Sequence, residues 1–189
     1  QYEELMLQPD LDSLLSVLEK TPYGGEITKA KAMSEGIVAI ELALRNDFVK
    51  TFRKIAKIVR EEEAEKYLRI FLHRWDVQNI KTILRGKNIH TTNEEILSCL
   101  VPVGELDEVA LTELLKQPDL KAVVDLLATF GIIYAKPLTQ AFPDFSKEGD
   151  ISILECALDT FYYADSLASV PSPSYNDTLI RELIATEID

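Results

Sequence analysis

Three segments of this chain recur in the same order roughly 110 residues later, and this internal repeat limits the possible fold more than any other feature. The run QPDL occurs at 8–11 and again at 117–120. The run IELAL at 40–44 is matched by LECAL at 154–158. Because the offsets between the copies differ by only a few residues, the pattern indicates a duplicated segment. The third match pairs Tyr67, Ile70, Phe71, Trp75 and Asp76 with Ile180, Leu183, Ile184, Ile188 and Asp189.

A repeat of this length predicts that a whole small helical domain has been duplicated, since helical-pair repeats have only about 34 to 47 residues. We therefore expect two similar units, residues 1–112 and 113–189. The first unit would be incomplete at its N-terminus, and the second would stop at Asp189, the counterpart of Asp76. The sequence is accordingly interpreted as a truncated fragment of a longer parent chain, because an amphipathic helix would otherwise end in its middle.

Apolar residues recur at helical spacing along nearly the whole chain, and period-two alternation bounded by hairpin turns is absent. The predicted fold class is therefore all-α, built from tandem similar helical bundles. One long apolar stripe is expected to bend near Asn46 and Asp47. The expected helices cover residues 11–18, 28–59, 61–88, 91–100, 107–116, 119–130, 149–170 and 175–189.

Capping residues mark several of these helix ends. Asp10 is a favourable N-cap for the helix expected at 11–18, and Thr92 or Asn93 is one for the short helix expected at 91–100. The helix expected at 61–88 begins with the acidic run at 61–63 and is expected to stop at Gly86 or Asn88.

The charge balance bears on the kind of partner that this chain could bind. It has 32 acidic and 20 basic residues, a net charge of −12. Because nucleic-acid binding rests on neutralising phosphates with Lys and Arg, a nucleic-acid partner is disfavoured and a basic protein partner fits better. An interpretation that stays equally open is that the negative charge only keeps the chain in solution.

Neither a membrane span nor a disulfide framework is expected. The longest weakly charged run, 122–135, contains Asp125 and is shorter than the roughly 20 residues that a membrane helix needs. Cys99 and Cys156 each lie among apolar residues at helical spacing, which predicts two small buried side chains.

Motifs for catalysis, cofactors and metals are missing from the sequence. The run YGGEITKAK at 23–31 lacks the spacer and the Gly-Lys-Ser/Thr ending of a phosphate-binding loop. His73 and His90 show no metal-ligand spacing. Glu41 and Glu155 occupy equivalent positions in the two copies, which favours a structural role over acid–base chemistry. We expect no catalytic, cofactor-binding or metal site and no small-molecule ligand. A helical enzyme would instead need convergent acids in one pocket, with a perturbed pKa.

The run RWDVQNIKTILRGK at 74–87 carries an unusual set of polar residues for an amphipathic helix. At 100° per residue, Asp76 and Asn79 share a face with Ile80, whereas Arg85 lies on the opposite side. A partner for Arg85 must therefore come from another helix, another domain or another subunit. The favoured interpretation is an interhelical hydrogen-bond cluster, and the alternative is contact with a partner protein.

Three segments together carry a resemblance to a known family: WDVQNIKTILRGK, EEILSCLVPVGELD and ECALDTFYYADSL. They resemble the C subunit of the archaeal and bacterial V-type (A-type) ATPase/ATP synthase, whose eukaryotic relative is the d subunit of the V-ATPase. The matching positions are Asp76, Asn79, Ile80, Leu84, Arg85, Pro102, Gly104, Glu155, Ala157 and Leu158.

The resemblance implies a funnel of three similar all-helical domains, of which this chain would cover about one and two-thirds. It implies a non-catalytic adaptor without cofactors, bound to the cytoplasmic face of the membrane rotor ring as a peripheral subunit. Such an adaptor would hold the central-stalk subunits and pass torque between ATP hydrolysis or synthesis and proton or sodium transport. Asp76, Asn79 and Arg85 are the candidate docking residues. The alternative function is a general α-helical scaffold unrelated to ATPases.

Overall fold

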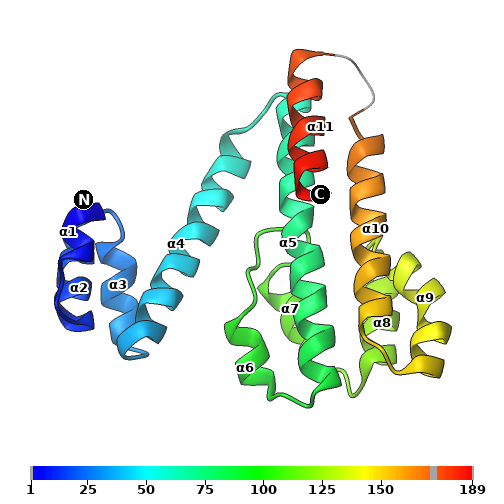
Figure 1. Ribbon diagram of the computed structural model, residues 1–189, viewed down its shortest axis with the longest axis horizontal. Helices are drawn as coiled ribbons and strands as arrows, with labels where there is room; N and C mark the ends of the chain where they lie inside the picture. Colours follow the sequence, from blue (N-terminus) through cyan, green and yellow to red (C-terminus); the bar gives the residue numbers. More distant parts are fainter. Residues whose placement is uncertain (1, 171–173, 189) are drawn as a thin grey trace. The chain divides into compact units, whose positions relative to one another are not determined.

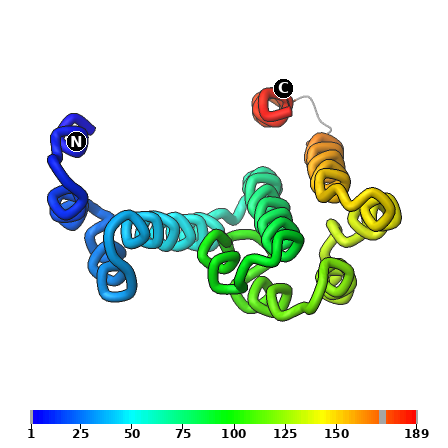
Figure 2. Tube along the Cα trace, turned by 60° about the horizontal axis from the view of Figure 1, so that its bottom comes forward, coloured from blue at the N-terminus to red at the C-terminus, as the bar shows by residue number. Residues whose placement is uncertain are grey.

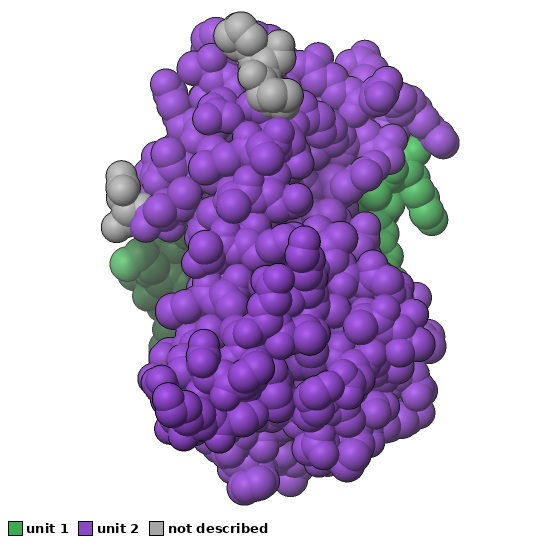
Figure 3. Space-filling model, turned by 90° about the vertical axis from the view of Figure 1, so that its right-hand side faces the viewer, with its two compact units in different colours: residues 1–58 green, residues 59–189 purple. Residues whose placement is uncertain are grey.

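The chain folds into helices only, as far as the computed structural model describes it, which is for residues 2–170 and 174–188 (Figure 1). The all-α prediction is confirmed. The helices fall into two compact units, residues 1–58 and 59–189, which Figure 3 shows in different colours. Unit 1 holds α1 (Tyr2–Met6), α2 (Leu11–Leu18), α3 (Gly24–Lys31) and α4 (Gly36–Ile58). Unit 2 holds α5 (Glu62–Asn88), α6 (Asn93–Ser98), α7 (Glu108–Leu115), α8 (Leu120–Thr129), α9 (Ala135–Glu148), α10 (Ser152–Ala168) and α11 (Tyr175–Ile188).

Unit 1 buries a small apolar core between α2, α3 and α4. The expected single helix over 28–59 is wrong, because the chain leaves the helical path at 32–35, between α3 and α4. Gly36 opens α4 with a φ of 59°, a left-handed conformation that suits glycine. The helix then runs without interruption through Asn46 and Asp47, where the apolar stripe predicts a bend. The core consists of Leu15, Leu18, Ile27, Ala30, Ala39, Ile40 and Ala43.

Unit 2 is built around α5, its longest helix, with α10 running antiparallel beside it (Figure 1). The C-terminal half of α5 packs on α6, α7 and α8, and α11 lies against the other end of the α5–α10 pair (Figures 1 and 2). The apolar face of α5 is buried in this core. It consists of Val77, Ile80, Ile83 and Leu84, which pack with residues such as Leu114, Leu127, Leu138 and Leu158.

The sequence pattern does not predict helix α9. Its sequence contains two prolines, which argue against a helix. Pro137 lies in the first turn, where a backbone N–H has no partner within the helix. Pro143 lies inside the helix, where proline removes a backbone hydrogen bond. Gly149 ends the helix in a left-handed conformation, with a φ of 74°.

The predicted N-caps are confirmed. Asp10 caps α2 by accepting a 2.8 Å hydrogen bond from the Ser13 backbone N–H. Thr92 forms a capping box with Glu95 at the start of α6. Helix α5 ends at Asn88, one of the two expected stops, whereas Gly86 lies buried inside the helix. There a Cβ would overlap the side chain of Ile96, so glycine lets α6 approach α5 closely.

The two copies of QPDL begin corresponding helices. Asp119 caps α8 through the Ala122 N–H at 2.8 Å, with φ and ψ of −151° and 175°, against −152° and 170° at Asp10 in α2. The following helices, α3 and α9, both start at a tyrosine N-cap. These local matches support a duplication, and its division into 1–112 and 113–189 stays a proposal. Asp189, the expected counterpart of Asp76, lies outside the described residues.

The prediction that both cysteines are buried is wrong. Cys99 and Cys156 are exposed free thiols. Leu154 and Leu158 are fully buried on α10, and Cys156, two positions from each, points about 200° away from both. Cys99 is the C-cap of α6, just beyond its last helical residue.

Candidate interaction site on helix α5

Asp76 is a buried carboxylate that holds the loop between α6 and α7. Its side chain is 1% exposed, although aspartate is rarely buried without partners. One carboxylate oxygen accepts a hydrogen bond from the Glu105 N–H at 2.8 Å, and the other accepts one from the Leu106 N–H at 3.0 Å. The two backbone donors replace the water that the carboxylate loses on burial.

Gly104 makes this close approach possible. A Cβ at this position would lie within 3.0 Å of both carboxylate oxygens of Asp76, nearer than real Cβ atoms come to such neighbours. The backbone of the loop can therefore reach Asp76 only if residue 104 has no side chain. Asp76 and Gly104 both belong to the segments that carry the family resemblance, and they meet here although 28 residues separate them.

Asn79, about one helical turn after Asp76, holds the same loop at a second point. Its amide group donates to the Val101 carbonyl oxygen at 2.7 Å, and its side-chain oxygen accepts from the Val101 N–H at 2.8 Å. Both hydrogen-bonding groups of one loop residue are thus satisfied by one side chain. We call Asp76 and Asn79 the loop clamp, since together they fix residues 101–106 to α5.

Burial is the main influence on the titration of Asp76, and it raises the pKa of the carboxyl from 3.8 to about 6. The backbone N–H groups of Leu106 and Glu105 act in the opposite direction, because they stabilise the ionised form. His73 nearby also lowers the pKa, and the Glu105 carboxylate raises it. The Asp76 carboxylate is hydrogen-bonded to two backbone N–H groups inside the fold. Its raised pKa therefore follows from its burial in the folded structure.

Arg85 lies on the opposite side of α5 from Asp76, as the helical spacing predicts, and its partner comes from another helix. Its guanidinium binds the Glu155 carboxylate of α10 through two hydrogen bonds, from Nε to Oε1 and from Nη2 to Oε2, the second at 2.8 Å. This pairing raises the pKa of Arg85. One turn away, Lys81 binds Asp159 at 2.9 and 2.7 Å. The two ion pairs fix the antiparallel register of α5 and α10.

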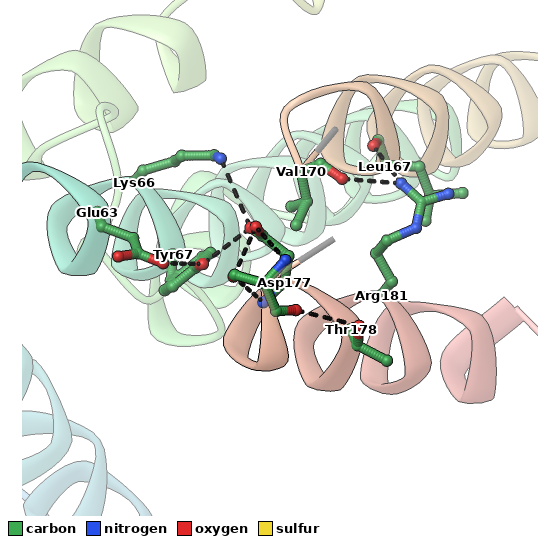
Figure 4. A network of polar contacts seen from close by, with 9 residues as sticks. Glu63, Lys66, Tyr67, Leu167, Val170, Asp177, Thr178 and Arg181 are labelled. Atoms are coloured by element: carbon green, nitrogen blue, oxygen red, sulfur yellow. Dashed lines mark hydrogen bonds and ion pairs between the residues drawn. The ribbon is translucent and has the colours of Figure 1, made fainter. Parts of the chain in front are cut away.

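A third polar network joins the N-terminal half of α5 to α11. Figure 4 shows the Tyr67 hydroxyl pointing toward Asp177, to which it donates a hydrogen bond at 2.8 Å. The buried Asp177 also accepts from the Ser174 hydroxyl at 2.7 Å, and Lys66 lies 3.9 Å away. Arg181 of α11 donates to the carbonyl oxygens of Leu167 and Val170 at the end of α10, at 3.0 and 2.9 Å (Figure 4).

A groove of about 810 Å³ adjoins the loop clamp, between the first half of α5 and the end of α10. Buried Ile70 and Ser166 lie at its base. Glu105, whose backbone N–H is held by Asp76, lies at the same end of the groove as His73. The Nε2 atom of His73 is buried 3.3 Å from a Glu105 carboxylate oxygen, and no hydrogen bond to it is formed within the described structure.

The candidate docking residues therefore occupy different environments. Asp76 and Asn79 point inward and bind a loop, whereas the side chain of Arg85 is half-exposed and paired with Glu155. The favoured interhelical contact is thus present at Arg85, whereas Asp76 and Asn79 bind a loop. Contact of these residues with a partner protein stays a prediction. The spacing along α5 does not reveal the role of Gly104 or the groove, because both depend on segments distant in sequence. Among the described residues, no group of three or more His, Cys, Asp or Glu side chains is placed to hold a metal ion.

Comparison with known proteins gives a consistent picture over the whole chain. Residues 1–189 match the family model described as ATP synthase (C/AC39) subunit. The C subunit of the A-type ATP synthase of Methanocaldococcus jannaschii is 28% identical over 189 residues, which cover 100% of this chain and 47% of the relative. The C subunits of the A-type ATP synthases of Methanococcoides burtonii and Halobacterium salinarum are 30% and 29% identical, over 100% of this chain and 50% and 53% of theirs. The chain thus spans about half the length of the curated relatives it matches.

Proposed function

This chain belongs to the family of ATP synthase (C/AC39) subunits, and from that premise we propose that it serves as a non-catalytic central-rotor adaptor. In this role it couples a membrane rotor ring to the central stalk of an A-type or V-type ATPase/ATP synthase. Its partners are the central-stalk subunits and the ring of the same complex. It acts on the cytoplasmic face of the membrane as a peripheral subunit, during proton or sodium transport.

The observation that carries this proposal is the way α5 is fastened along its length. Tyr67 joins its first half to α11, the loop clamp holds the middle, and Lys81 and Arg85 bind α10. An adaptor that transmits torque must resist bending and sliding of its helices. Polar contacts at three levels, around a close-packed apolar core with low compressibility, suit that role.

Among the described residues, no helix combines the length and the apolar character needed to cross a bilayer. The polar contacts of Asp76 and Arg85 are structural ones, which supports a role without catalysis.

Deleting the parent subunit from the assembled ATP synthase tests the proposal. We expect the catalytic head to continue ATP hydrolysis, while ion transport driven by that hydrolysis is lost. Hydrolysis is measured by phosphate release, and transport by a pH-sensitive or sodium-sensitive dye in vesicles. Loss of hydrolysis by the isolated head would contradict a non-catalytic role, and transport that persists without the subunit would contradict the coupling role.

A further inference from the structure

The groove between α5 and α10 carries negative charge that its own cations do not neutralise. Lys66 lies 3.9 Å from Asp177, and Arg69 binds Glu65 at 3.3 Å. In contrast, within the described part of the chain, the exposed carboxylates of Glu62 and Asp165 have no cation within ion-pair distance. Unit 2 as a whole has 23 acidic and 12 basic residues, so nearby positive charge is scarce.

The dimensions of the groove suit a helix. Its wall on α5 extends from Glu62 to His73, eleven helical steps and therefore about 16 Å, or three helical turns. Ile70 and Ile133 supply apolar contact area, and the short side chains of Ser166 and Ser169 leave room on the α10 side. An apolar base between acidic edges is the arrangement in which a groove receives an amphipathic helix.

We propose that this groove binds a helical segment of a partner subunit, with Lys or Arg along one side and apolar residues along the other. The proposal rests on the proposed function for the source of the partner, which is another subunit of the same complex. Carboxylates at Glu62 of α5, Glu105 of the α6–α7 loop and Asp165 of α10 line the groove and pair with the cations of the incoming helix. The loop clamp positions Glu105, since Asp76 binds its backbone N–H.

Binding of a synthetic probe to the purified chain tests the charge complementarity. The probe is a fluorescein-labelled, alanine-rich helical peptide of about five turns, with Lys along one side and Leu along the other. A second peptide carries Glu in place of Lys. We expect fluorescence anisotropy to show binding of the Lys peptide that weakens as ionic strength rises, and no binding of the Glu peptide. Equal binding of the two peptides would overturn the proposal.

Matched variants separate the groove from the general negative charge of the chain. Glu62→Gln combined with Asp165→Asn should weaken binding of the Lys peptide about fivefold or more, since each exposed charge pair contributes up to about 1 kcal/mol. The control, Glu108→Gln combined with Glu148→Gln, removes the same charge from exposed positions outside the groove. It should weaken binding less than twofold. Equal losses in both double variants would show that binding is diffuse and would contradict a groove site.

A steric variant tests the same site without a change of charge. Ser169→Trp should fill the groove and weaken the Lys peptide about tenfold, whereas circular dichroism and the thermal midpoint report whether the fold is kept. Unchanged binding to a folded Ser169→Trp protein would overturn the proposal. If that variant unfolds, the double charge variants decide the question alone.

Placing the Glu62→Gln and Asp165→Asn changes in the parent subunit separates this inference from the proposed function. We expect weaker binding of the subunit to the rest of the complex. Normal assembly with these changes, together with uncoupling when the subunit is deleted, would overturn the groove inference and leave the adaptor role standing. The opposite result is peptide binding that depends on the groove, together with ion transport that stays coupled to hydrolysis when the subunit is deleted. It would overturn the adaptor role and the inference that the partner is a subunit of the same complex.

Discussion

At the residue scale, the dependence of Asp76 on Gly104 gives the sharpest prediction. Gly104→Ala should lower the free energy of unfolding by about 2–4 kcal/mol, because the added Cβ overlaps both carboxylate oxygens and forces the loop off α5. Urea denaturation followed by circular dichroism measures the change. Gly25→Ala is the control, since a Cβ there meets nothing within 4 Å, and we expect a change of about 1 kcal/mol or less.

The physical cause can be checked by a double-mutant cycle. In an Asp76→Ala background the carboxylate oxygens are gone, so Gly104→Ala should be less damaging there by about 1 kcal/mol or more. An equal loss in both backgrounds would show that the overlap with Asp76 is not what makes glycine necessary.

Asp76 also predicts a pH dependence of stability. Because folding raises its pKa from 3.8 to about 6, its contribution to stability is full below the unfolded pKa and is lost as pH rises through about 6. The free energy of unfolding of the wild type, minus that of Asp76→Asn, should therefore fall by on the order of 2–3 kcal/mol between about pH 4 and pH 7. Urea titrations of both proteins across this range measure it, and a constant difference would contradict the raised pKa.

Helical spacing alone predicts which way the polar residues of α5 point. It places Asp76 and Asn79 together and Arg85 opposite, and the structure confirms this arrangement. The spacing does not reveal their partners, because Val101 and Glu155 follow 22 and 70 residues after the α5 residues that they bind. Such pairings depend on how the helices pack, which a local pattern does not encode.

At the element scale, the errors in helix assignment have local causes. The sequence pattern misses the break at 32–35 and the helix α9, because apolar spacing continues across the first and prolines interrupt the second. It predicts the capped helices α2 and α6 well, since a capping side chain acts on its own helix. The exposed cysteines show a further limit, because apolar neighbours in sequence do not place a residue on the buried face.

The α5–α10 register gives the prediction for this scale. A double-mutant cycle with Arg85→Ala and Glu155→Ala should give a coupling energy of about 1 kcal/mol, a modest value because the Arg85 side chain is half-exposed. The coupling should decrease in high salt, where exposed ion pairs are screened. A coupling near zero in urea denaturation at low salt would show that this ion pair does not help to hold the two helices.

At the scale of the whole molecule, we expect unit 2 to behave as one rigid part organised on α5. Its core residues come from α5 to α10, and a smaller apolar cluster of Ile70, Val170 and Ile184 joins α11 to the same helix. The duplication inferred from the sequence stays a proposal. It is supported by the equivalent aspartate N-caps that begin α2 and α8. A part that transmits torque should have no helix that opens independently at its centre.

Native-state hydrogen exchange of unit 2, followed by mass spectrometry in increasing urea, tests this claim most directly. Exchange of an amide by local opening has a lower free energy than exchange by unfolding of the whole unit. We predict that residues 76–87 of α5 exchange at the same free energy as the buried segments of α8 and α10, and only when the unit unfolds. Exchange of the α5 segment at a lower free energy, while α8 and α10 stay protected, would contradict a rigid part built on this helix.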